Sequence, residues 1–112
     1  MEPLVHTAEL RVIRTYRPDG LRVEGVVDAH GHQHLRTALE AVEQTAGDVQ
    51  LDLSALEFLD LGGLRLLMTF ARSRAAGSQV ELVGLAPHLR EVISLVGWDE
   101  TPGLRLGANH VN

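Results

Sequence analysis

The stretch LDLSALEFLDLGGL, residues 51–64, decides the fold of this chain. The stretch starts with alternating apolar and polar residues, as a strand does, and this strand-like run ends at Asp60. Leu61 and the glycines Gly62 and Gly63 follow and lead into a run with helical spacing. A strand that delivers an acid and small residues to a helix N-terminus forms a surface site, because the first N–H groups of the helix are free to bind. Neither Leu61 nor Gly62 supplies a hydroxyl there.

Working outward from this stretch, alternation predicts further strands. The turn sequence Arg17-Pro18-Asp19-Gly20 separates the first two, because Pro sets φ at its second position and Gly closes it. The strands on either side should therefore pair antiparallel. The predicted strands are residues 8–14, 21–27, 49–53 and 79–85, with a short last strand at 104–106.

Apolar residues at helical spacing predict three helices: residues 33–45, residues 63–76, and a third that begins near Pro87. Gly47, Gly77 and Gly97 follow them as stop signals, and the proline fits the first turn of its helix. In the second helix Arg65, Arg72 and Ser73 should face outward. The expected buried stripes are Leu35, Leu39 and Val42; Leu64, Leu67, Met68, Ala71 and Ala75; and Leu89, Val92, Ile93 and Val96.

The element order is thus β-β-α-β-α-β-α, with a final short strand. Parallel strands joined by crossover helices, added to an early hairpin, predict a single α/β domain with a mixed four- to five-stranded sheet. Its three helices should pack mainly on one face. The domain covers residues 1–112, with a core at about 8–100, and residues 107–112 are expected to form a loose tail.

Composition narrows the function classes. The chain has no cysteine, which excludes disulfides, thiolate metal sites and thiol catalysis. Its formal net charge is −5 without a basic stripe, which argues against nucleic acid as a partner. No apolar run is long enough to insert into a membrane, and the N-terminus lacks the features of a signal peptide. All ten basic residues are arginine, a bias typical of GC-rich bacterial genomes. These features favour a cytoplasmic bacterial protein.

Motifs for catalysis are absent. The sequence has no G-x-S-x-G elbow, no P-loop and no G-x-G-x-x-G, so we expect no enzyme and no cofactor. His30, His32 and His34 form an H-x-H-x-H run, while His88 stands alone after Pro87. Such a run can hold a metal or form a pH-sensitive patch. Because it crosses a strand-to-helix junction, we favour a solvated helix start and expect no metal site.

Three segments resemble the STAS domain family, the anti-sigma factor antagonists. Gly25-Val26-Val27-Asp28 is similar to the family's G-x-L-D. LDLSALEFLDLGGLRLL, residues 51–67, is similar to D-L-S-x-V-x-F-[IM]-D-S-[ST]-G-L-x-x-L. GSQVELVGLAPHLREVISLVGWDE, residues 77–100, is similar to the family's strand and third helix. Together these segments span about residues 8–100, and the resemblance implies the STAS fold.

The resemblance also implies a function. In the family, a serine just after the motif aspartate is phosphorylated by an anti-sigma kinase, and phosphate weakens binding of that kinase by adding negative charge. Here Leu61 stands at the phosphoacceptor position and Gly62 at the next hydroxyl position. The implied protein is a non-catalytic regulatory module of transcription signalling. It would bind an anti-sigma factor kinase, or a related signalling partner, without phospho-switching.

The predicted partner-binding residues are those that match the motif positions of the family, together with residues on the outer face of the second helix. Three of them could instead have a structural role: Asp28 and Asp60 can cap helices, and Leu61 can pack down at the helix start. A long Arg65 changes how a partner approaches, and Thr69 or Ser73 could accept phosphate instead. The set is Asp28, Asp60, Leu61, Gly62, Gly63, Arg65, Thr69 and Arg72.

An alternative function belongs to another class. Small STAS proteins also serve as subunits that dock on the ATPase of phospholipid-transport ABC systems, where no phosphoserine is needed. The sequence leaves open which partner applies, and whether the domain forms a homodimer through a sheet edge.

Overall fold

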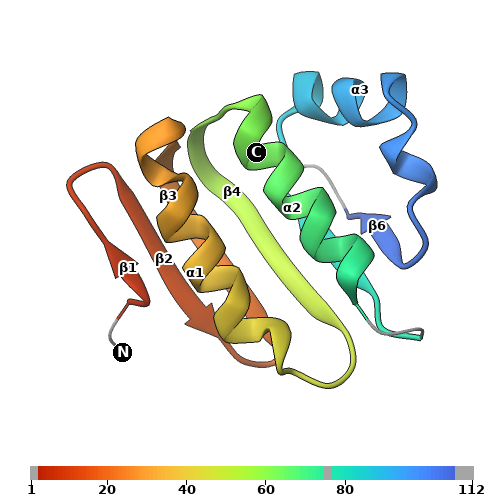
Figure 1. The fold of residues 1–112 in the computed structure, drawn as a ribbon, viewed down its shortest axis with the longest axis horizontal. Coiled ribbons are helices and arrows are strands. Elements are labelled where there is room, and N and C mark those ends of the chain that lie inside the picture. The colour runs from red at the N-terminus through yellow and green to blue at the C-terminus, as the bar shows by residue number, and fades with distance from the viewer. Residues whose placement is uncertain (1–2, 75–76, 108–112) are drawn as a thin grey trace.

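A computed structural model describes residues 3–74 and 77–107. They form one six-stranded sheet with the strand order β1-β2-β3-β4-β5-β6 and three α-helices (Figure 1). Short 3-10 helices, η1 (Ala29–Gly31) and η2 (Trp98–Glu100), complete the described part. The strands are β1 Val5–His6, β2 Leu10–Thr15, β3 Gly20–Val27, β4 Val49–Leu59, β5 Val80–Val83 and β6 Leu104–Leu106; the α-helices are α1 His32–Glu43, α2 Leu61–Ser73 and α3 Pro87–Leu95.

The sheet is mixed, as predicted. β2 and β3 form the expected antiparallel hairpin, whereas β3, β4, β5 and β6 are parallel to one another and are joined by α1, α2 and α3. Parallel crossovers are right-handed in nearly all proteins, so crossovers that step in one direction across a sheet place their helices on one face. Figure 1 shows α1 and α2 side by side over that face, with α3 at its upper end.

The core lies between this face and the two long helices. β4 contributes Leu51 and Leu53, and α2 contributes Leu64, Leu67 and Met68, all of them buried. The period-2 burial along the first half of β4 and the helical spacing along α2 are the patterns that the sequence displays. The stretch at residues 51–64 therefore forms the centre of the domain.

Two other predicted helical stripes are mostly confirmed. In α1, Leu35, Leu39 and Val42 are buried, and in α3 Leu89 and Ile93 are. Val96, predicted as buried, is 54% exposed, because α3 ends at Leu95 and the chain turns through Gly97 at φ +80°. The predicted Ala75 lies outside the described residues.

The strand number was underestimated, since the sheet has six strands and not four to five. The strand that was missed is β1, whose two residues are too few to show alternation. The strand predicted at 49–53 continues to Leu59, and α2 begins at Leu61, two residues before the predicted start at 63. Of the expected loose tail at residues 107–112, only Gly107 is described, and it is buried and donates to the Leu82 carbonyl; residues 108–112 lie outside the described part.

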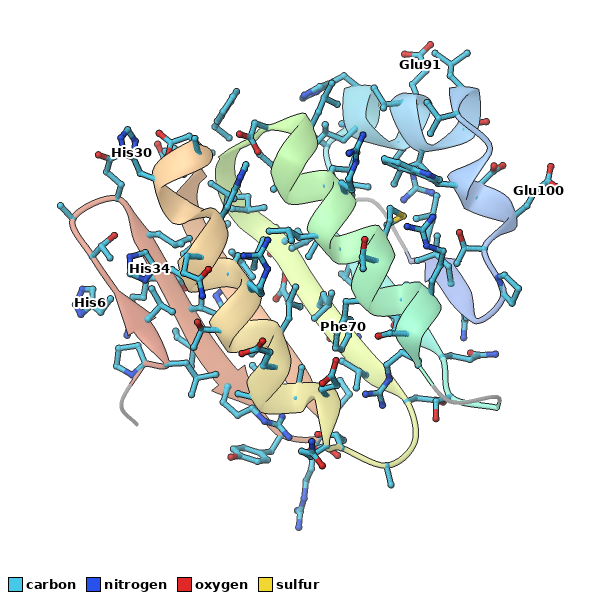
Figure 2. All side chains as sticks on the ribbon, in the orientation of Figure 1. His6, His30, His34, Phe70, Glu91 and Glu100 are labelled. Atoms are coloured by element: carbon cyan, nitrogen blue, oxygen red, sulfur yellow. The ribbon has the colours of Figure 1, made fainter. Side chains whose placement is uncertain are left out.

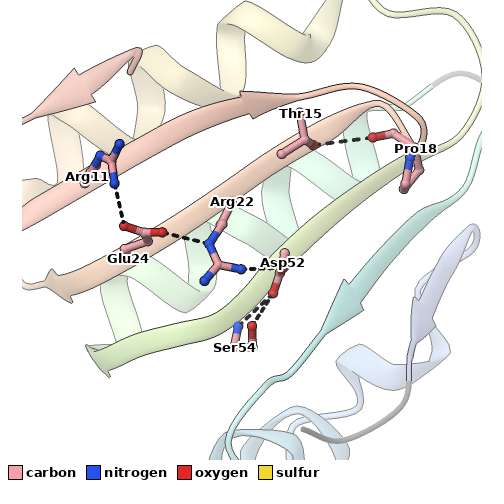
Figure 3. Close-up of polar contacts among 7 residues, drawn as sticks. All are labelled: Arg11, Thr15, Pro18, Arg22, Glu24, Asp52 and Ser54. Carbon is pink, nitrogen blue, oxygen red and sulfur yellow. Dashed lines mark hydrogen bonds and ion pairs between the residues drawn. The ribbon is translucent and has the colours of Figure 1, made fainter. Parts of the chain in front are cut away.

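The face of the sheet opposite α1 and α2 carries a chain of polar contacts (Figure 3). Glu24 accepts from Arg11 at 3.3 Å and from Arg22 at 2.7 Å, and Arg22 also donates to Asp52 at 3.1 Å. Asp52 in turn accepts from the hydroxyl of Ser54 at 2.6 Å. Burial raises the pKa of Asp52, but the bonds from Ser54 and the charge of Arg22 outweigh it and lower that pKa. These four charged side chains are thus paired with one another within the sheet.

The C-terminal end of α1 is held by Arg74, the residue just after α2. Its guanidinium donates to the backbone carbonyls of Val42, Glu43, Thr45 and Gly47 at 2.7–3.3 Å. The last carbonyls of a helix have no partner within the helix, so a cation here satisfies them and complements the helix dipole. Arg74 therefore fixes α1 against α2.

Candidate functional site

The carboxyl ends of β3 and β4 bring two predicted site residues to one edge of the sheet. Val27 pairs with Leu59 in the parallel register, so Asp28 and Asp60 follow directly after paired residues. Loops that leave the carboxyl ends of parallel strands are the usual location of binding sites in α/β sheets. The region from Asp60 to Gly63 at this edge is called the α2 entry loop below.

Both acids cap helices, as the sequence suggested. The Asp60 carboxylate accepts the Gly63 N–H at 2.7 Å, with Asp60 in extended conformation, which makes it the N-cap of α2. The Asp28 carboxylate accepts the His30 N–H at 3.0 Å and caps η1. An acid at a helix start also complements the dipole, so each aspartate stabilises the local backbone.

His32, the first residue of α1, binds the Asp60 carboxylate directly. Its Nε2 lies 2.7 Å from Oδ1 and 3.0 Å from Oδ2, and both side chains are partly buried. Burial alone would raise the pKa of Asp60, but the bonds from His32 and Gly63 and the charge of His32 together lower it below its usual value. The contact joins the starts of α1 and α2.

The same imidazole explains why residue 62 has no side chain. A Cβ built on Gly62 would lie 2.4 Å from Cε1 and 3.0 Å from Nε2 of His32. Real Cβ atoms do not approach a ring carbon so closely, because carbon contacts stay at about 3.5–4.0 Å. The His32 ring therefore lies in the space that a Cβ at residue 62 would take, so any side chain there, a serine or threonine included, must displace the ring.

Leu61 is exposed, which resolves the two roles that the sequence left open for it. Its side chain is 63% exposed at the first position of α2, so it does not pack down as a staple. Phe58, three residues earlier on β4, is 52% exposed. Large apolar side chains at the carboxyl edge of the sheet are thus available to a partner.

Of the predicted residues on α2, Gly63 is buried, whereas four others form one exposed stripe. Leu61, Arg65, Thr69 and Arg72 are separated by four, four and three positions, and all are exposed. The stripe is about 16 Å long at 1.5 Å per residue. Arg72 lies 3.5 Å from the hydroxyl of Thr69, and the Ser73 hydroxyl donates to the Phe70 carbonyl at 2.8 Å. The structure thus brings these residues onto one helix face, with Asp28 apart at the end of β3.

The histidine run does not gather into a cluster. Figure 2 shows His30 and His34 on the side of the molecule where α1 meets β1, together with His6. Within residues 3–74 and 77–107, no three His, Asp or Glu side chains are placed to hold a metal ion. His88 is exposed on α3. In the same part of the chain, no helix is both long enough and apolar enough to cross a membrane.

Sequence reasoning missed two residues of this edge. The His32–Asp60 contact was not predicted, although both residues follow parallel neighbouring strands, and that topology brings the starts of α1 and α2 together. Phe58 was missed because the strand was predicted to end at residue 53. Residues 54–58 do not alternate cleanly and their pairing with β3 is irregular, so no clear period marked them as part of the strand.

Comparison with solved structures supports the fold. An anti-sigma factor antagonist from Mycobacterium paratuberculosis superposes with a TM-score of 0.70 and 28% identity, covering 93% of this chain and 88% of that chain. The antagonist SpoIIAA in its unphosphorylated form gives 0.63 and 16% identity, covering 88% and 89%. The Bacillus cell fate determinant SpoIIAA in its phosphorylated form gives 0.64 and 16%, covering 88% and 91%.

The two SpoIIAA structures share the fold at an identity too low to carry more than that. Among curated proteins none matches the sequence. A family model described as "Mlab, STAS domain" matches residues 10–106, which is nearly the whole described domain. The chain therefore belongs to the STAS domain family.

Proposed function

We propose that this protein is a non-catalytic, partner-binding regulatory module similar to the anti-sigma factor antagonists. It binds an anti-sigma factor kinase, or a related signalling partner, in the bacterial cytoplasm and does so without phospho-switching. The observation that carries the proposal is Leu61, which is 63% exposed at the start of α2 where the family places its phosphoacceptor serine. Leucine accepts no phosphate, so the site stays in one chemical state.

The character of the α2 entry loop supports binding. A few side chains that pack closely near the centre of an interface contribute most of the binding energy, and Leu61 has the exposure that a partner contact needs. The cap and the His32 contact hold Asp60 in place, so the loop is ordered before a partner arrives. A preorganised surface loses less entropy on binding.

The stripe along α2 extends this surface. Arg65 is exposed one turn beyond Leu61, where its planar guanidinium can pair bidentately with a partner carboxylate. Thr69 and Arg72 continue the stripe. We infer a partner contact that starts at the α2 entry loop and runs along the outer face of this helix.

The test is an affinity pull-down from native cytosol with wild type, Leu61→Ser and Leu61→Asp. A retained partner with Leu61→Ser and a lost partner with Leu61→Asp support the docking surface. The matched control is Leu95→Asp, because Leu95 is an 81% exposed leucine at the end of another helix, α3. If all three variants capture what wild type captures, the α2 entry loop is not the docking surface.

The absence of a switch is tested separately. Incubation with the captured kinase and ATP should leave the intact mass unchanged. An added phosphate, on Thr69 or Ser73 for example, would contradict this part of the proposal.

The same permanently apolar position fits the alternative function, a small STAS subunit docked on the ATPase of a phospholipid-transport ABC system. A subunit that stays bound to its partner needs no phosphoacceptor, and the exposed Leu61 suits such a permanent contact. The captured partner separates the two functions. An ATPase supports the transporter subunit, whereas a small histidine-kinase-like protein supports the antagonist.

A further inference from the structure

β4 extends far beyond its neighbour β5. β4 has 11 residues and pairs with β3 up to Leu59, whereas β5 has four residues and pairs with β4 only over Val49–Asp52. Among the described residues, no strand lies beside β4 on the β5 side after Asp52. The edge of a strand without a neighbour presents backbone N–H and C=O groups that can pair with another chain.

The chain leaves the sheet at Gly84 and opens a groove beside this edge. Gly84 has φ +75°, and a Cβ on it would lie 2.6 Å from the Ser54 Cβ, so the backbone passes tightly over β4 there and then turns away into α3. The result is a groove between the second half of β4 and the start of α3. This β4–α3 groove is lined by Leu53, Leu56, Glu57, Phe58, Leu59, Gly84, Leu85, Ala86, His88 and Leu89.

The groove contains a cavity of about 80 Å³ whose wall includes both leucine side chains and polar atoms. A single water needs roughly 10–15 Å³ measured in this way, so the space can take an apolar side chain. Leu53, Leu85 and Leu89 are buried in its wall, and Leu56 is partly buried. Phe58, 52% exposed, stands at its edge. The cavity therefore favours an aliphatic or aromatic side chain over solvent.

The charge around the groove is negative. Glu57 is exposed and is the one carboxylate among the residues that line the groove, where His88 also lies. Glu91 extends from α3 at this end of the molecule (Figure 2). Such a rim attracts a segment with basic residues and disfavours an acidic one.

We propose that the β4–α3 groove binds an extended peptide segment of a partner protein. The segment adds to the free edge of β4 as a strand, places one apolar side chain in the cavity and sets a basic residue against Glu57. Backbone pairing supplies affinity, while the cavity and the rim select the side chains. This site adjoins the Leu61 surface at Phe58, but the proposal does not depend on the partner proposed for that surface.

The test uses a phage-displayed library of random 12-residue peptides selected on the purified full chain. Enriched peptides are synthesised, and their affinity is measured by fluorescence polarisation. Ala86→Trp fills the groove, and its matched control is Ala41→Trp at an exposed site on α1. Glu57→Lys reverses the rim charge without disturbing the core, and its control is Glu40→Lys, also exposed on α1.

The expected peptides combine basic residues with an apolar residue. Ala86→Trp should weaken their binding about tenfold or more, and Glu57→Lys about threefold or more, with the second effect reduced by salt. Bound peptide should protect β4 amides between residues 54 and 59 from hydrogen exchange. The proposal is overturned if no peptide is enriched over a bait-free selection, or if Ala86→Trp and Glu57→Lys bind the peptides as well as their controls do. Leu61→Asp should not weaken peptide binding, whereas it should abolish capture in the pull-down, and this difference separates the two results.

Discussion

Substitution of Gly62 by alanine tests whether the His32 ring occupies the space above the α2 entry loop. The new Cβ would lie 2.4 Å from the ring Cε1, so the ring must move by about 1 Å to restore normal contact. That shift breaks contacts with Asp60 that are now 2.7 and 3.0 Å long. A hydrogen bond to a charged group contributes about 1.5–3 kcal/mol, and partial solvent access reduces this to about 1–2 kcal/mol.

Helix propensity acts in the opposite direction. Alanine in a helix is favoured over glycine by up to about 1 kcal/mol. Gly62→Ala should therefore destabilise wild type by about 0.5–1 kcal/mol, yet stabilise a His32→Ala background by about 0.5–1 kcal/mol. The coupling between the two sites is then about 1–2 kcal/mol.

Urea unfolding of wild type, both single variants and the double variant at pH 7 measures this coupling. The control cycle replaces His32→Ala with His34→Ala, an exposed histidine on the same helix. The control should be additive within about 0.5 kcal/mol. If the His32 cycle is additive as well, the ring does not exclude a side chain at residue 62, and the reasoning is refuted.

Other predictions concern the cap, α1 and the turn at the groove. Because the pKa of Asp60 is lowered in the fold, its carboxylate stabilises the protein above about pH 4 and loses this contribution as the pH falls through the lower folded value. The stability difference between wild type and Asp60→Asn should thus narrow below about pH 4, and a difference constant with pH in urea titrations would count against it. Arg74→Met removes four bonds to backbone carbonyls and should cost about 1–3 kcal/mol in thermal unfolding, whereas Arg72→Met on the solvent face should cost under about 0.5 kcal/mol. Gly84→Ala should destabilise more than Gly47→Ala, by about 1 kcal/mol or more in urea unfolding. Both glycines have positive φ, but only Gly84 has a neighbouring strand residue in the way; equal costs would mean that the strand yields freely.

The fold was largely readable from local patterns. Three local patterns each identified an element, and together they identified the topology. They are the alternation at residues 49–53, the helical stripe at Leu64, Leu67 and Met68, and the turn before Gly20. Element ends were less accurate. β1 is too short for a period to be recognised, and the second half of β4 loses clear alternation where its pairing with β3 is irregular. Pattern reasoning detects periodicity, and these segments have little.

The site was predictable only where its residues interact locally. Asp60 as the cap of α2 follows from its place before a helix, and the structure confirms it. The contact with His32 joins residues 28 positions apart, so it depends on how two crossovers meet in space. The exposure of Leu61 also depends on the tertiary fold, because no sequence pattern shows whether the first side chain of a helix packs into a pocket. Whether these residues bind a partner is a question for the pull-down.

The order of strands in the sheet, which repeats their order in the chain, has a consequence for folding. Each strand pairs with the strand before it, so no connection needs to close a loop longer than one helix and its turns. The β2–β3 hairpin can form first, and every later strand finds its neighbour already in place. Such short closures favour rapid folding for a parallel sheet and allow the domain to assemble in the direction of synthesis.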